Sequence, residues 1–91
     1  MATPEKKATI ILASGEVKAL DHRPTLKEAQ EIVGGYIELV KVKGATLVVD
    51  EDGKMKNRPL NEVITKIYGP EIYGRIIVGD VILLRGWKTV G

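Results

Sequence analysis

The sequence predicts one α+β domain whose elements follow the order β-α-β-β-α-β. Two segments have apolar residues at helical spacing between capping signals, and the segments between them are rich in β-branched residues and bounded by glycine turns. The 91 residues are 44% hydrophobic and 29% charged, which is typical of a globular domain with one core. We expect an antiparallel or mixed sheet with two helices packed on one face, compatible with a split βαβ sandwich.

The N-terminal part predicts an arm followed by a strand. Residues 1–7 are polar, contain Pro4 and show no periodicity, so we expect a flexible arm, with residues 8–91 forming the domain. Apolar residues from Ala8 onward indicate the first strand. The Ser14-Gly15 pair favours a hairpin at this strand, and the alternative is one long strand with a glycine bulge.

The first helix has clear signals at both ends. Thr25 and Glu28 form a T-x-x-E capping box, which satisfies two backbone donors at a helix start. Leu26 and Val33 bound a segment with one apolar face, and Gly34 suits the left-handed position after a helix. The spacing predicts a helix over Leu26 to Val33.

Two strands follow this helix. Residues 36–42 are rich in β-branched and aromatic residues but do not alternate cleanly, which suggests that part of the strand is covered on both faces. A Lys43-Gly44 turn leads into residues 45–49, so the two strands are expected to pair antiparallel. An acidic turn, Asp50 to Gly53, ends the second strand.

The second helix and the last strand complete the domain. Leu60 to Ile67 has apolar residues at helical spacing, with Pro59 in the expected first turn and Gly69-Pro70 as the stop. Residues 76–84 are interrupted by a glycine, and we favour an extended piece followed by a strand from Asp80 to Arg85 over a tight hairpin. The candidates for the second helix cap are Asn57 and Arg58.

Three segments together resemble a known family. They read TLKEAQEIVGGYIELV, LVVDEDGKMKNRPLNEVI and IIVGDVILL, and their order and spacing resemble the phage- and plasmid-associated domain of unknown function numbered 3846. The resemblance implies an accessory protein of a phage or another mobile element. It implies no activity and no functional residue.

Catalytic and metal-binding motifs are not evident. His22 is the only histidine, Ser14 the only serine, and cysteine is absent, so thiolate ligands are excluded and a Ser-His-Asp triad has no motif to support it. An EF-hand loop with Gly53 at its sixth position would need ligands at Val48 and Pro59, which cannot supply them. We therefore expect a protein that is not an enzyme and has no metal or cofactor.

Two sets of residues are candidates for ligand binding. The first could stack on bases and grip phosphates of a nucleotide, whose pocket would favour a homo-oligomer. The second could bind nucleic acid through its positive charge, although aromatic RNA-recognition motifs are absent. The first set is Tyr68, Tyr73, Arg75, Arg85 and Trp87; the second is Lys41, Lys43, Lys54, Lys56 and Arg58.

Function is expected to lie in binding. The leading hypothesis is a small non-enzymatic accessory protein that sequesters or blocks a host protein or a nucleotide signal, and the alternative is a nucleic-acid-binding protein. The net charge of +2 gives a weak overall field. No apolar stretch is long enough to span a bilayer, so we expect no membrane partner and a location in the cytoplasm of a bacterial or archaeal host.

Overall fold

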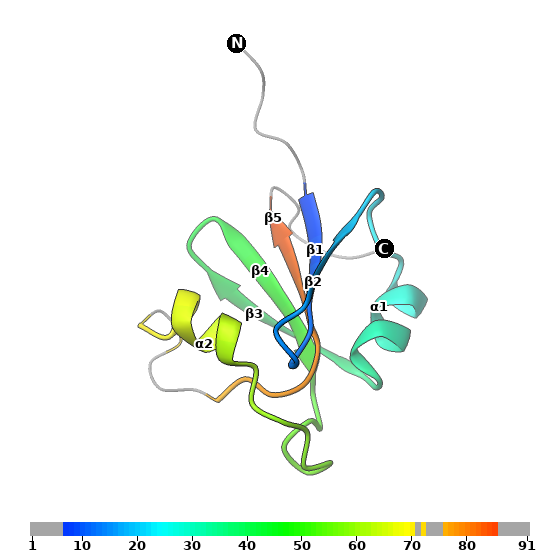
Figure 1. Ribbon diagram of the computed structural model, residues 1–91. Helices are drawn as coiled ribbons and strands as arrows, with labels where there is room; N and C mark the ends of the chain where they lie inside the picture. Colours follow the sequence, from blue (N-terminus) through cyan, green and yellow to red (C-terminus); the bar gives the residue numbers. More distant parts are fainter. Residues whose placement is uncertain (1–6, 71, 73–75, 86–91) are drawn as a thin grey trace.

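The computed structural model describes residues 7–70, 72 and 76–85. It contains a five-stranded antiparallel sheet with strand order β2-β1-β5-β4-β3 and two helices (Figure 1). The predicted α+β class and the order of elements are confirmed. The elements are β1 (Lys7–Ile11), β2 (Val17–Leu20), α1 (Leu26–Val33), β3 (Ile37–Val42), β4 (Ala45–Asp50), α2 (Glu62–Tyr68) and β5 (Val81–Arg85).

The first strand is part of a hairpin, as the Ser14-Gly15 turn predicts. Ile11 pairs with Val17, and Leu12 N–H donates to Glu16 O at 2.8 Å. Gly15 has φ +100°, a left-handed conformation that side chains with a Cβ rarely adopt. β1 begins at Lys7, so the strand starts one residue inside the predicted 1–7 arm. Residues 1–6 lie outside the described residues.

β5 is the central strand of the sheet. It pairs antiparallel with β1 on one side and with β4 on the other. Before it, Val78 forms an isolated bridge with Leu60, and Gly79 turns the chain with φ +78°. The extended piece followed by a strand is confirmed, and residues 76–84 do not form a hairpin of their own.

The two helices lie on opposite faces of the sheet (Figure 1), so the prediction that both pack on one face is wrong. Ala29 and Val33 of α1 join the core on one face, whereas Ile64 and Tyr68 of α2 join the core on the other. The reason is that β5 is buried along four consecutive residues, 81–84, which alternate between the faces. Apolar side chains of β5 therefore lie on both faces of the sheet, and each face is shielded from solvent by its own helix.

The split βαβ expectation fails at the second helix. In a split βαβ unit a helix joins two parallel strands that have another strand between them, so all neighbouring strands can be antiparallel. α1 makes a connection of this kind, because it joins β2 to β3, which run parallel at the two edges of the sheet. α2 does not, because it joins β4 to its antiparallel neighbour β5. β5 therefore lies between the two hairpins, β1–β2 and β3–β4.

The first helix forms as predicted. Thr25 Oγ1 accepts from Glu28 N–H and Glu28 Oε1 accepts from Thr25 N–H, both at 3.1 Å, which completes the capping box. Gly34 closes the helix with φ +86°. These local signals explain why the predicted and observed ends agree.

The second helix starts later than predicted, at Glu62, and its cap is Asn61 instead of Asn57 or Arg58. Leu60 is held extended by its bridge to Val78, so Pro59 lies before the helix. Asn57 has φ +56° and belongs to the preceding turn. None of the described helices is long and apolar enough to cross a membrane.

Candidate functional site

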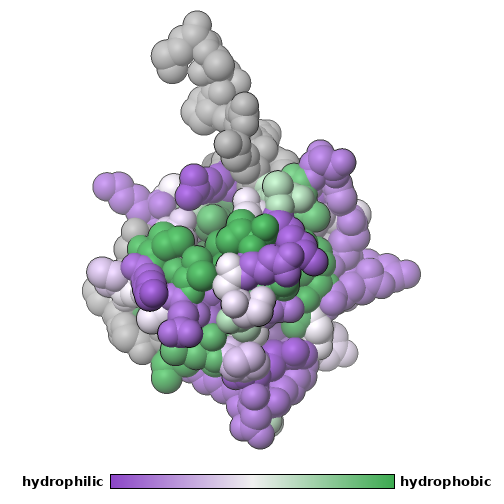
Figure 2. Space-filling view, viewed as in Figure 1, coloured by the Kyte–Doolittle hydropathy of each residue, from purple (hydrophilic) through white to green (hydrophobic). Residues whose placement is uncertain are grey.

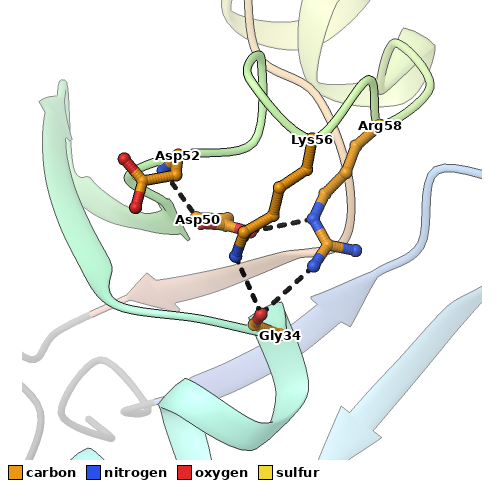
Figure 3. A network of polar contacts seen from close by, with 5 residues as sticks. All are labelled: Gly34, Asp50, Asp52, Lys56 and Arg58. Atoms are coloured by element: carbon orange, nitrogen blue, oxygen red, sulfur yellow. Dashed lines mark hydrogen bonds and ion pairs between the residues drawn. The ribbon is translucent and has the colours of Figure 1, made fainter.

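A buried carboxylate forms the centre of a network of polar contacts that joins β4, the following turn and the end of α1 (Figure 3). Asp50 ends β4, and its side chain is fully shielded from solvent. It accepts hydrogen bonds from Asp52 N–H at 2.9 Å, Lys56 Nζ at 3.0 Å and Arg58 Nε at 2.8 Å. Both cations belong to the turn that follows β4, so this turn folds back over the end of its own strand.

The same two cations also contact the C-terminal end of α1. Lys56 Nζ and Arg58 Nη2 each donate to Gly34 O at 3.1 Å. A helix leaves its last carbonyls without helical partners and carries partial negative charge there, so two cations stabilise this end. The network therefore fastens α1 to the loop between β4 and α2.

The surroundings of Asp50 keep it ionised. Burial of the carboxyl group opposes ionisation and would raise its pKa. The hydrogen bond from Asp52 N–H and those from Lys56 and Arg58 outweigh burial, so the pKa of Asp50 lies below its ordinary value. The ion pairs consequently persist at neutral pH.

The proposed nucleic-acid set is not gathered at one place. Lys56 and Arg58 bind Asp50 and Gly34, and Lys54 is exposed in the same turn. Lys41 and Lys43 lie at the opposite end of β4, beside the β3–β4 turn. Six residues of strand separate the two groups, a length of about 17 Å. Each end therefore carries a small positive group, and Lys56 and Arg58 are engaged in internal contacts.

The proposed nucleotide set is not brought together among the described residues. Tyr68 is 7% exposed and belongs to the core beneath α2, so its ring is unavailable for stacking on a base. Arg85 is exposed at the end of β5, opposite Ala45 of β4. Tyr73, Arg75 and Trp87 lie outside the described residues.

His22 lies between two carboxylates at the start of α1. Its Nδ1 is 2.8 Å from Asp21 Oδ1 and its Nε2 is 2.7 Å from Glu28 Oε2. The hydrogen bonds to Asp21 and Glu28 raise the pKa of His22, in that order of importance. Ser14 Oγ instead accepts from Glu16 N–H at 3.4 Å. Both ring nitrogens are thus engaged by acids, and Ser14 and His22 do not form the pair that a triad requires.

A small pocket lies beside the acidic turn, on the α2 side of the sheet. Its volume is about 170 Å³, below the roughly 300 Å³ at which small-molecule sites begin. Its walls come from Glu38, Glu51 and Lys54 and from the apolar segment 76–78. Within the described ranges, no group of three potential metal ligands is present. The pocket suits a few water molecules better than a nucleotide.

Apolar surface gathers over α2 and the adjoining β1–β2 hairpin (Figure 2). Ile67 is 53% exposed on α2, Leu60 is 45% exposed just before it, and Val17 is 57% exposed on β2. Val63 lies one turn before Ile67 and is half-buried against the core. We call these four residues the α2 surface. Helical spacing places Leu60, Val63 and Ile67 on one apolar face, but an amphipathic pattern does not show how far that face extends beyond the sheet.

Asn61 connects α2 with two strands and was not identified from the sequence. It is fully buried, its Oδ1 accepts from Ile64 N–H, and its Nδ2 donates to Ile11 O and Gly79 O, both at 2.9 Å. The available signal was its position three residues before Ile64. Its contacts are structural and fix α2 beside the hairpin.

Comparison with known proteins identifies the family of this chain. The model of the family described as "Domain of unknown function (DUF3846)" matches residues 6–89, nearly the whole chain. No curated protein and no solved structure matched the chain. The match extends the resemblance of the three sequence segments to both ends of the fold, and the chain therefore belongs to the DUF3846 family.

Proposed function

We propose that this protein is a small non-enzymatic binding protein that blocks or sequesters a host protein through the α2 surface. The observation that carries the proposal is the exposure of Val17, Leu60 and Ile67 on one side of the sheet. Contiguous apolar side chains at a polar-rimmed surface are a common feature of protein interaction sites. As in the sequence-based hypothesis, the setting is a phage or another mobile element.

The polar groups support a binding role over a catalytic one. Asp50, Lys56 and Arg58 bind one another and the end of α1, and His22 is held between two acids. Groups engaged in this way are used for structure. A nucleotide signal remains the other candidate ligand, with less support because Tyr68 is in the core.

Affinity capture with a matched control tests the proposal. The wild-type protein, an Ile67→Lys variant and a Leu26→Lys variant would be used to capture proteins from a bacterial lysate. Leu26 is 49% exposed at the start of α1, so this control carries the same change at similar exposure on the other helix. We expect Ile67→Lys to weaken capture of a specific protein about tenfold or more, and Leu26→Lys to leave it unchanged.

Two results would contradict the proposal. Equal capture by all three proteins would remove the α2 surface from the interaction. Saturable heat on titration with nucleotide signals would instead favour a small ligand.

Nucleic-acid binding stays the alternative, through Lys41, Lys43 and Lys54 with Lys56 and Arg58. It predicts affinity that falls steeply with salt. A mobility-shift assay in low salt with single- and double-stranded probes tests it, and an unshifted probe would dismiss it. Lys56→Gln is a poor probe of this function, because it also breaks the contacts to Asp50 and Gly34.

A further inference from the structure

The outer edge of β2 is an open strand edge. β2 is the terminal strand of the sheet, and no strand among residues 7–70, 72 and 76–85 pairs with its outer side. Residues 16 to 19 are all exposed. α1 packs mainly over β3, β4 and β5 and so leaves this edge uncovered. An exposed edge presents unpaired backbone donors and acceptors that another strand can use.

The register shows which backbone groups are available. Leu12 N–H donates to Glu16 O, so Glu16 directs its backbone groups toward β1. In an antiparallel ladder every second residue of a strand is hydrogen-bonded to the same neighbour, so Lys18 and Leu20 also direct their backbone groups toward β1. Val17 and Ala19 then direct their N–H and C=O groups outward. These two residues can form the hydrogen-bonded positions of a new ladder.

The side chains around this edge are self-complementary. If Val17 lies opposite Val17 of a second copy in an antiparallel ladder, Glu16 of each copy lies opposite Lys18 of the other. The two charged residues share a sheet face because they are separated by two positions. The pairing thus combines one apolar contact with two opposite-charge pairs, each of the kind that stabilises cross-strand neighbours.

Neighbouring registers lack this match. Shifting the second copy by two residues in one direction places Lys18 opposite Lys18. Shifting it by two more residues in the same direction places Val17 opposite Asp21. The other edge strand, β3, offers no equivalent, because Glu38 and Lys41 lie on opposite sheet faces and cannot become cross-strand partners. Charge complementarity therefore distinguishes the edge of β2 from that of β3.

We propose that the protein forms a symmetric dimer in which β2 pairs antiparallel with β2 of a second copy, joining the two sheets edge to edge. The dimer shares one residue with the α2 surface, Val17 of β2. The pairing of Glu16 with Lys18 involves no residue of that surface, so charge changes at these two positions test the dimer separately. A ladder of this length buries less than the usual area of stable complexes, so we expect a dissociation constant of about 0.1 mM.

Sedimentation velocity of charge variants tests the dimer. Glu16→Lys alone creates two lysine–lysine contacts across the ladder, and Lys18→Glu alone creates two glutamate–glutamate contacts. Each single variant is expected to bind itself about tenfold more weakly than the wild type. An equimolar mixture of the two restores both opposite-charge pairs, as does the double variant Glu16→Lys/Lys18→Glu, and both should recover wild-type association.

Lys41→Glu on the edge of β3 is the matched control. It changes the net charge as much as Lys18→Glu does and should leave association unchanged. All these residues are exposed, so the variants should fold, which circular dichroism can verify. A wild type that stays monomeric at about 1 mM, or a dimer unaffected by either single charge reversal, would overturn the proposal; the monomeric result would leave the edge to a strand of another protein.

Discussion

The two helices are fastened to the sheet by different chemistry. The C-terminal end of α1 is fixed by charges, since Lys56 and Arg58 bridge Gly34 O and the buried Asp50 carboxylate. The N-terminal end of α2 is fixed by the neutral amide of Asn61, which reaches β1 and the turn before β5. The charged attachment depends on protonation, whereas the amide attachment does not. The two sides of the sheet should consequently respond differently to mutation and to pH.

The largest effect is expected at Asn61. Asn61→Ala removes the helix cap and leaves the carbonyls of Ile11 and Gly79 without their amide donor inside the core, a cost of about 3 kcal/mol. Urea unfolding monitored by circular dichroism measures it. Thr25→Ala, which removes the exposed cap of α1, is the control and should cost about 1 kcal/mol.

A second variant keeps this prediction testable if Asn61→Ala does not fold. Asn61→Ser retains an acceptor for the cap but cannot donate to both carbonyls. Its loss of unfolding free energy should therefore lie between those of Asn61→Ala and Thr25→Ala. Equal losses for Asn61→Ala and Thr25→Ala would show that the two caps are equivalent.

The charged attachment of α1 ranks next. Asp50→Asn removes the partner of Lys56 and Arg58, but both cations are about one-third exposed and can turn toward water, so we expect a loss of about 2 kcal/mol. Asp52→Asn is the control, because Asp52 joins the network through its backbone N–H. The free energy of unfolding of the two variants, measured in parallel, tests this difference. Equal values would contradict the role of the Asp50 carboxylate in fastening α1.

A smaller loss is expected where α1 meets Arg58. A Cβ on Gly34 would lie 2.5 Å from Arg58 Nη2 and would also strain a backbone with φ +86°. Gly44 has φ +77° with no atom near the added Cβ, so Gly44→Ala measures the backbone strain alone, about 1 kcal/mol. The loss of unfolding free energy in Gly34→Ala should exceed the loss in Gly44→Ala by the cost of moving Arg58. Equal melting temperatures would mean that Arg58 moves freely.

The smallest effects concern pH, and their signs differ between the ends of α1. The pKa of Asp50 is lowered by folding, so its stabilisation is complete above its ordinary value of 3.8 and is lost as pH falls through the folded pKa. The pKa of His22 is raised, so its stabilisation is complete below 6.5 and is lost as pH rises through the folded pKa. Contacts of Asn61 do not titrate in either range.

Thermal unfolding across pH measures these contributions. The melting temperature of His22→Gln should approach that of the wild type as pH rises beyond the folded pKa of His22. The difference between Asp50→Asn and the wild type should disappear in acid. Nuclear magnetic resonance titration of His22 gives its pKa directly, and a value below 6.5 would contradict the assignment.

Features governed by neighbouring residues could be predicted from the sequence. The capping box of Thr25 and Glu28 and the turns at Gly15 and Gly44 depend on local chemistry, and each was located correctly. The face that each helix covers depends on distant strands. The unbroken apolar run of β5 was a usable signal for two covered faces, because a strand buried on both sides has no polar alternation.

The candidate site was less predictable for the same reason. Lys56 and Arg58 follow an acidic turn in the sequence, but their contact with Gly34 requires α1 to end beside that turn. Tyr68 is spaced like the buried residues of α2, and its burial follows from the sheet beneath it. Asn61 was missed because Leu60 looks helical by spacing, whereas its bridge to Val78 delays the helix.

The central position of β5 determines when the sheet can assemble. β1–β2 and β3–β4 are hairpins that close within short stretches of chain, but they have no strand contact with each other until β5 is placed between them. During synthesis β5 leaves the ribosome after both hairpins and both helices. The Lys7–Arg85 pair spans the entire described fold, so loop closure over this distance comes last. Until then the nascent chain exposes two apolar half-sheets, and cooperative folding begins once the last strand has been released.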